Sequence, residues 1–509
     1  MSNEMSRREA LRLGLYGLAA SGMTLLPRQA RAVPLLMGSP NGSPVGRKAL
    51  GPRKVLLIFL RGGNDGINTL VPFGDRPYIH PLIRPTIQIT NPQNINGFCG
   101  LHPAMDAFTP AGRSSLALIH RVGYEDSSLS HFTGQYYWET GQVASLDAQD
   151  GWVAKAAVHG LPQPGVSAAG CPEFATASVA TKLQAAFGSP TPANVQPNVP
   201  FIGDEAGNSP DDAYSLDAGT TDPELLAAIE KFRGVQAATG PGLLDHYQNA
   251  ALPSQWDALA RSYGEAMINT ECEVANTVLA PYTSAGTQTY PEGGVQGLPA
   301  ENWVTPFGNA VRDAVRLLKL TSCVVAGVEV GTWDHHSDQG GEVGRHADKL
   351  RALSQAMQAA FEDLGNDVVN PTETLIMVMS EFGRTTRENS SGGTDHARAS
   401  VMMAMGPTAR GGVYNCDPTT WFQGAPADPV TGRPTWFSPN LPASDPLAKY
   451  IFPLTDFRIV YYEALARHLG ITDLDVLEQI IPGIKAKVEE HQQGVPTADP
   501  LFAEIGYLL

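Results

Sequence analysis

Cysteine is scarce in this sequence, and no two cysteines are close together. The 509 residues contain five, at Cys99, Cys171, Cys272, Cys323 and Cys416, with no Cys-x-x-Cys pair. A cysteine-bound structural zinc or a dithiol redox centre is therefore not indicated. One or two disulfides stay open if the compartment is oxidising, although the spacing does not pair them. Cys323 lies in an apolar run and is expected to be a small buried hydrophobic side chain.

Basic residues are outnumbered, and long apolar stretches are missing. The chain has 35 Lys and Arg against 51 Asp and Glu, a net charge of −16. Such a surface repels phosphate backbones and anionic lipid, which argues against nucleic acid as a partner. The uncharged stretch at 13–26 is too short for a membrane-spanning helix, and no later segment is long enough. The sequence contains neither an internal repeat nor a coiled-coil pattern.

The segment 1–32 has the features of an export signal. Arg7 and Arg8 precede the uncharged stretch at 13–26, and Ala30-Arg31-Ala32 offers a small-x-small cleavage site. Paired arginines ahead of a mildly apolar region are typical of the twin-arginine route. We therefore expect a bacterial protein that the twin-arginine translocase exports to the periplasm or beyond. The alternative is a cytoplasmic protein that has a basic N-terminus by chance.

The rest of the chain predicts one large α/β domain. A linker rich in Gly, Pro and Ser at 33–53 leads to a domain at 54–509, within which 154–298 is interpreted as an insertion or cap region. Apolar runs without a polar face alternate with helical segments, which predicts a mostly parallel, doubly wound sheet with helices on both faces. The predicted strands are 54–60, 115–122, 322–330, 374–379 and 400–405, and the predicted helices include 132–141, 223–232, 255–275, 307–319, 343–365 and 455–469.

Polar residues follow several of these strands at the point where each ends. Open α/β sheets bind ligands at the edge where the carboxyl ends of parallel strands meet. Because carboxylates and imidazoles bind divalent metal ions, a cluster of them at this edge predicts a metal site. Ser130 is the candidate nucleophile, with Ser127 and Ser128 as close rivals, and its neighbour His131 could contact the substrate or accept a proton. The candidates at strand ends are Asp65, Ser130, Asp334, His336, Glu381 and His396.

Three of these candidates also have a simpler role that the sequence leaves open. Asp65 could act only as a turn residue or helix cap, and Ser130 could cap the helix that follows it. Glu381 could belong to a solvated loop and pair with Arg384 or Arg387.

Short motifs surround the candidates: Arg61-Gly62-Gly63-Asn64-Asp65-Gly66, Ser130-His131-Phe132, Tyr137-Trp138-Glu139-Thr140-Gly141, Trp333-Asp334-His335-His336 with Gln339, Ser380-Glu381-Phe382-Gly383-Arg384, Gly392-Gly393-Thr394-Asp395-His396 and Thr455-Asp456-Phe457-Arg458. Through these motifs, the sequence resembles the twin-arginine-exported domain of unknown function 1501 family, in the alkaline phosphatase and sulfatase superfamily. The resemblance covers most of the chain after the export signal. It implies an alkaline-phosphatase-like fold.

The resemblance also implies a role for each candidate. Asp65 is similar to the metal ligand on the first strand of the superfamily, and Ser130 is similar to its nucleophile. Asp334 and His336, completed by His396, are similar to the ligands of one metal ion. By the same resemblance, the carboxylate of Glu381 would belong to a second metal ion.

Two features depart from the superfamily pattern. Phe382 stands where a histidine usually follows the carboxylate, and the spacing between Asp334 and His336 is unusually short. His335, between those two residues, is interpreted as a surface variant rather than an additional ligand.

The sequence therefore predicts an exported, metal-dependent hydrolase of phosphate or sulfate esters. One or two divalent ions are expected, among Zn, Ca, Mg and Mn, with a small-molecule or polymeric ester as substrate. The alternative is a non-catalytic binding protein of the periplasm or cell surface on the same fold, because a fold alone does not decide activity.

Overall fold

The computed structural model describes residues 53–144, 150–162, 175–179, 201–202, 284–365 and 373–509. The predicted export signal, nearly all of the predicted linker and the predicted helices at 223–232 and 255–275 lie outside these residues. Their assignments remain predictions. Within the described part, no helix is both long enough and apolar enough to cross a membrane.

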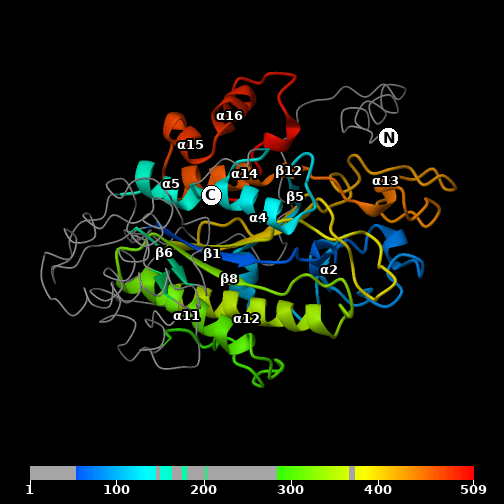
Figure 1. Ribbon diagram of the computed structural model, residues 1–509, viewed down its shortest axis with the longest axis horizontal. Coiled ribbons are helices and arrows are strands. Elements are labelled where there is room, and N and C mark those ends of the chain that lie inside the picture. The colour runs from blue at the N-terminus through cyan, green and yellow to red at the C-terminus, as the bar shows by residue number, and fades with distance from the viewer. Residues whose placement is uncertain (1–52, 145–149, 163–174, 180–200, 203–283, 366–372) are drawn as a thin grey trace, which may run out of the picture.

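Among the described residues, a nine-stranded sheet has the order β11-β5-β10-β9-β1-β8-β6-β7, with β12 paired to β5 (Figure 1). All neighbouring pairs are parallel except that β10 runs antiparallel to both β5 and β9. The prediction of an α/β fold with a mostly parallel sheet is therefore confirmed. The strands are β1 (Arg53–Leu60), β5 (Leu116–Gly123), β6 (Thr176–Val179), β7 (Phe201–Ile202), β8 (Val325–Val330), β9 (Glu373–Met379), β10 (Ser400–Met405), β11 (Gly412–Tyr414) and β12 (Thr455–Asp456).

Helices cover both faces of the sheet, as Figure 1 shows. On one face lie α11 (Val304–Leu320) and α12 (Arg345–Gly365); on the other lie α4 (His131–Thr140), α5 (Trp152–His159) and α14 (Phe457–Glu463). Alternate residues of β1 enter the two cores, because successive side chains of a strand point to opposite faces. Leu56 and Ile58 join the α11 and α12 side, whereas Leu57 and Phe59 join the α4 and α14 side. Burial on both faces explains why β1 is a continuous apolar run.

The direction of β10 positions the site. The sequence predicted β9 and β10 as strands of a parallel sheet, and their ranges are correct to within one residue, but β10 is antiparallel to β9. A parallel return would need a crossover to the opposite edge, whereas the connection at 380–399 contains no helix. The connection therefore stays at the edge where β9 ends, and it holds His396 there.

Two other expectations are corrected. The predicted helix at 455–469 is instead β12, α14 and a π-helical turn, η4 (Ala464–His468), before Gly470 at φ +78°. Asp456 caps α14 and pairs with Arg458, so local hydrogen bonding overrides the helical pattern at its start. From the predicted cap region at 154–298, β6 and β7 belong to the central sheet, since strands this short and partly polar give little sequence signal. The boundaries of an insertion remain a prediction.

The remaining described elements are short and lie around this framework. A three-stranded sheet, in the order β2-β4-β3, packs beside the first loop after β1. The elements are α2 (Gly66–Thr69), β2 (Leu70–Val71), η1 (Arg76–Ile79), β3 (Gln93–Asn94), β4 (Gly100–Leu101), α3 (Pro110–Ser114), α13 (Pro446–Lys449), α15 (Leu474–Ile480), α16 (Ile484–Gln492) and η5 (Pro500–Phe502).

Candidate metal site

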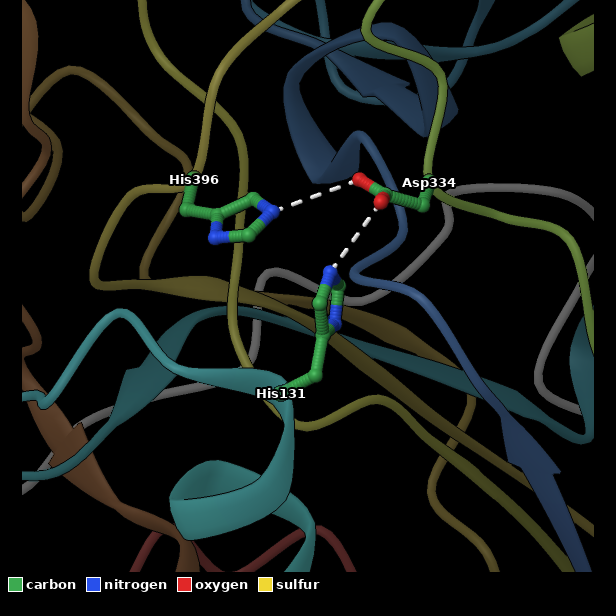
Figure 2. A group of neighbouring side chains, drawn as sticks. All are labelled: His131, Asp334 and His396. Atoms are coloured by element: carbon green, nitrogen blue, oxygen red, sulfur yellow. Dashed lines mark hydrogen bonds and ion pairs between the residues drawn. The ribbon is translucent and has the colours of Figure 1, made fainter.

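Two loops and one helix bring histidine and aspartate side chains together at the edge of the sheet. His131 is the first residue of α4, Asp334 and His336 follow β8, and His396 precedes β10. Figure 2 shows His131, Asp334 and His396 pointing toward one another. One ligand atom from each of these three residues lies within 4.8 Å of the other two. The structure thus brings together the predicted residues Asp334, His336 and His396, and adds His131.

Asp334 lies at the centre of the group. Its Oδ2 is 3.2 Å from His131 Nε2, and its Oδ1 is 3.0 Å from His336 Nε2 and 3.3 Å from His396 Nε2. The Nε2 atoms of His336 and His396 are themselves 3.0 Å apart. Three imidazoles therefore present the same ring nitrogen to one carboxylate.

The opposite ring nitrogen of each histidine is occupied by an acceptor. His131 Nδ1 lies 2.9 Å from Glu381 Oε1, and His336 Nδ1 lies 3.2 Å from Asp395 Oδ1. His396 Nδ1 lies 2.7 Å from the backbone carbonyl oxygen of Leu129. Because carboxylate and carbonyl oxygens only accept hydrogen bonds, each Nδ1 carries a proton when the imidazole is neutral. All three Nε2 lone pairs then face the cluster.

Inward-facing lone pairs need a positive centre between them. Two unprotonated nitrogens at 3.0 Å, as in His336 and His396, cannot hydrogen-bond to each other. In the same neutral form, His131 Nε2 faces Asp334 Oδ2 at 3.2 Å without a proton to donate, and it has no other hydrogen-bond partner in the described structure. Ligands at zinc distances in tetrahedral geometry lie about 3.3 Å apart, close to the separations that surround Asp334. The group therefore fits a metal ion whose imidazole ligands are oriented by outer hydrogen-bond acceptors.

Charge at the site favours an ionised Asp334. Burial works against ionisation, but the neighbouring His396 imidazole and the hydrogen bond and charge of Arg384 hold the Asp334 pKa well below its ordinary value. The hydrogen bond to Glu381 raises the pKa of His131 above its ordinary value, against the effect of burial. A proton and a metal ion would thus compete for the same Nε2 of His131.

Glu381 does not join the cluster. Its side chain is fully buried, and Oε1 accepts from Gly62 N at 2.8 Å, from Gln135 Nε2 at 3.0 Å and from His131 Nδ1. Burial disfavours the charged form, yet these hydrogen bonds, with that from His131 the strongest, lower its pKa. The carboxylate therefore orients His131 rather than serving as the predicted direct ligand. The alternative pairing with arginine is also not formed.

Asp65, the other predicted ligand, is committed elsewhere. Arg84 donates to it from Nη1 at 2.6 Å and Nη2 at 3.2 Å, and Gln339 Nε2 donates at 2.7 Å. Its Oδ1 also accepts the first N–H groups of α2, from Ile67 and Asn68. Burial raises the Asp65 pKa, but Arg84 outweighs this effect and lowers it to about 2. The helix-cap alternative is the one the structure contains, because a partner that is distant in sequence fills the remaining lone pairs.

Ser130 occupies the N-cap position of α4, directly before His131. Its side chain makes no capping hydrogen bond in the described structure, so the simpler role predicted for it is not used. Leu129, just before it, has φ +56°, a conformation uncommon outside glycine, and this turns its carbonyl oxygen to His396. No pattern in the sequence could have indicated this backbone contact.

Phe382 and His335, which the sequence singled out, both lie inside the protein. Phe382 is fully buried, with ring centroids 4.9 Å from His131 and 4.6 Å from His396. At the position where the resemblance would place a histidine ligand, it therefore packs against two imidazoles. His335 is only 2% exposed and packs near His346 with ring centroids 5.8 Å apart. The prediction of a surface variant is therefore wrong, because the chain turns between Asp334 and His336.

Arg384 was not predicted as a site residue, and it joins the loops. Its guanidinium donates to the carbonyl oxygens of Gly63 at 2.7 Å and Thr394 at 2.9 Å, to the Gly62 carbonyl, and to Asp334 Oδ1. Because Arg384 is buried and also bonded to carbonyl oxygens, its guanidinium is held in place and fixes the position of the Asp334 carboxylate. Gly62 is needed here because a Cβ atom would lie 2.5 Å from Asp334 N.

A family model described as "Protein of unknown function (DUF1501)" matches residues 52–420. No curated protein matches the sequence significantly. Among solved structures, Ps i-CgsB in complex with k-i-k-neocarrahexaose is similar at 12% identity, with 88% of this chain and 77% of that chain covered and a TM-score of 0.30. Alkaline phosphatase from the Antarctic bacterium TAB5 is similar at 12% identity, with 70% and 92% covered and a TM-score of 0.26. Likeness at this level says nothing about activity.

Proposed function

Given that this chain belongs to the DUF1501 family of proteins of unknown function, we propose that it is an exported, metal-dependent hydrolase of phosphate or sulfate esters. The observation that carries the proposal is the convergence of His131, His336 and His396 on Asp334 with every Nε2 facing inward. The features of an export signal at 1–32 support a periplasmic or extracellular location.

The ligand set favours one ion of the zinc type. Imidazole nitrogens suit zinc and other transition metals, whereas Ca and Mg prefer oxygen ligands. Glu381 orients an imidazole and Phe382 contributes no ligand, so among the described residues only one candidate group remains. Of the ions that the sequence predicted, we therefore propose Zn, and one ion rather than two.

The number of ligands separates an enzyme from a binding protein. Catalytic zinc sites use three protein ligands and keep one position open, whereas structural sites are closed by four. His131, Asp334 and His396 form a three-ligand group, and His336, whose side chain is 46% exposed, is the available fourth. An open fourth position supports hydrolysis; closure by His336 supports the non-catalytic alternative.

A bound ion would polarise an ester oxygen and lower the pKa of an attacking hydroxyl or water. The chain's own contribution is positioning. Glu381 keeps the Nδ1 proton on His131, and Arg384 fixes Asp334. Ser130 has a hydroxyl without a capping bond at the start of α4, where helix N–H groups favour an anionic ester. We propose Ser130 as the nucleophile.

The test combines metal analysis with turnover. Purified protein should bind close to one equivalent of a transition metal, and a screen of phosphate and sulfate monoesters should find turnover that a chelator removes. In Ser130→Ala, the metal content should stay and turnover should fall at least about a hundredfold. Full turnover in folded Ser130→Ala would reject the serine and indicate attack by water.

His336→Ala supplies the second half of the test. If the site is catalytic and open, this variant keeps the metal and its turnover. Strong loss of metal from His336→Ala, in a protein that turns over no ester, would instead establish the closed binding site.

A further inference from the structure

Two buried cysteines lie against each other on the side of the protein that carries the small three-stranded sheet. Cys99 stands between β3 and β4, and Cys416 follows β11. Both are 0% exposed, both are unbonded thiols, and the Cys99 side chain is close enough to affect the ionisation of the Cys416 thiol. The sequence could not pair them because they are hundreds of positions apart.

Other contacts hold the two segments in the same place. Asn96 Oδ1 accepts from Cys99 N at 2.8 Å, while its Nδ2 donates to the Cys416 carbonyl at 3.1 Å, across 320 positions of sequence. The Phe98 ring contacts Phe422 at 5.7 Å and Trp421 at 6.4 Å between centroids. Several contacts therefore hold the segment that carries Cys99 against the segment that carries Cys416.

We propose that Cys99 and Cys416 are a disulfide pair that closes while the chain folds. Joining the two thiols forms one S–S bond, releases two protons and passes two electrons to an oxidant. That oxidant is itself a disulfide, such as oxidised glutathione or an oxidised thiol–disulfide oxidoreductase, and it is reduced to thiols. The proposal is independent of the metal site.

Timing follows from burial. Burial, followed by the interaction with Cys99, raises the pKa of the Cys416 thiol well above its ordinary value. Exchange requires a thiolate that can reach the oxidant, so a chain that has already folded with both thiols reduced should oxidise slowly. Once formed, the bond would constrain the unfolded chain over a long loop and stabilise the folded protein.

Cys323 is the internal control. It is also 0% exposed, but its Sγ donates to the Val325 carbonyl at 3.4 Å and its charged neighbour is Lys54. If burial alone decided which thiols form a disulfide, the three described cysteines would behave alike. The proposal instead expects a disulfide between Cys99 and Cys416 and a free thiol at Cys323.

The experiment refolds the full chain from denaturant in a buffer of oxidised and reduced glutathione. Free thiols are then alkylated under denaturing conditions, and the digest is examined by mass spectrometry. The expected result is a joined peptide pair containing Cys99 and Cys416, two hydrogen atoms lighter than the separate peptides, with Cys323 alkylated. Alkylation of both Cys99 and Cys416 in refolded protein, or a bond from either to another cysteine, would overturn the proposal.

Thermal unfolding supplies an independent readout. Dithiothreitol present throughout refolding should lower the Tm of the wild type and of Cys323→Ser by a few degrees. It should leave the Tm of the double variant Cys99→Ser, Cys416→Ser unchanged. If the double variant fails to fold, the peptide result on the wild type still decides. An equal effect of dithiothreitol on a folded double variant would contradict the pairing.

Discussion

Asp65 and Asp334 follow neighbouring parallel strands, β1 and β8, at the same edge of the sheet, yet they have opposite surroundings. The Asp65 side chain is 1% exposed, and Arg84, Gln339 and the start of α2 occupy its oxygens. The Asp334 side chain is 39% exposed and faces three imidazole nitrogens. Arg384 bonds only Oδ1 of Asp334 and leaves Oδ2 facing an imidazole, whereas the fold occupies both oxygens of Asp65. We therefore assign Asp65 to the stability of the fold and propose Asp334 as the ligand of the candidate site.

The largest expected effect comes from breaking the buried ion pair between Asp65 and Arg84. Arg84→Met leaves Asp65 buried and ionised without its partner, which should lower the free energy of unfolding by about 3 to 5 kcal/mol. Urea unfolding measures this loss. Metal content per folded molecule should not change. A loss of metal without a loss of stability would reverse the roles assigned to Asp65 and Asp334.

A substitution of Asp334 should have the opposite effect, with a large change in metal affinity and a smaller change in stability. Asp334→Ala removes the central oxygen atoms, so metal affinity should fall by more than about a hundredfold. Stability of the metal-free protein should fall less than in Arg84→Met, because Arg384 keeps its carbonyl acceptors when Asp334 is removed. Competition with a chromogenic chelator measures the affinity. Asp126→Asn, an exposed acidic position at φ +55° before α4, is the matched control and should bind like wild type.

Glu381 tests whether a buried carboxylate can act through another residue. Glu381→Gln keeps the shape but weakens the hold on the His131 Nδ1 proton, so metal affinity should fall by about 10- to 100-fold. The same chelator competition measures it. An unchanged affinity would mean that His131 is not a ligand, whereas complete loss of metal would make Glu381 a direct ligand after all.

The smallest expected effect is on the pH dependence of stability, and it comes from the buried His468, which is distant in sequence from the candidate ligands. Burial, partly offset by the hydrogen bond to the Lys54 carbonyl, lowers the pKa of His468 from 6.5 to about 4. The unfolded chain binds this proton below pH 6.5 and the folded chain does not. The associated stability is therefore complete above pH 6.5 and is lost as pH falls toward 4.

His468→Gln should reduce the loss of stability between about pH 7 and about pH 5.5 by about 1 kcal/mol. Urea unfolding at the two pH values measures the difference. His159, which is exposed at the end of α5, provides the control substitution His159→Gln. Identical pH dependence in wild type and His468→Gln would show that His468 is not the group that titrates.

The sequence by itself determined the framework of this protein. Continuous apolar runs predicted β1, β9 and β10 to within one residue, because strands buried on both faces cannot afford polar positions. The rule that strand ends share an edge then placed Asp334, His336 and His396 together. Both of these inferences use only neighbours along the chain and the geometry of a sheet.

Only the tertiary structure decided which side chain pairs with which. The partner of Asp65 is Arg84, the partner of Glu381 is His131, and a turn at Leu129 supplies a carbonyl to His396. The antiparallel course of β10 and the approach of Cys99 to Cys416 belong to the same class. A hydrogen bond selects its acceptor by distance and direction, which depend on the path of the whole backbone. Residue types and their spacing therefore identified the candidates, and packing assigned their roles.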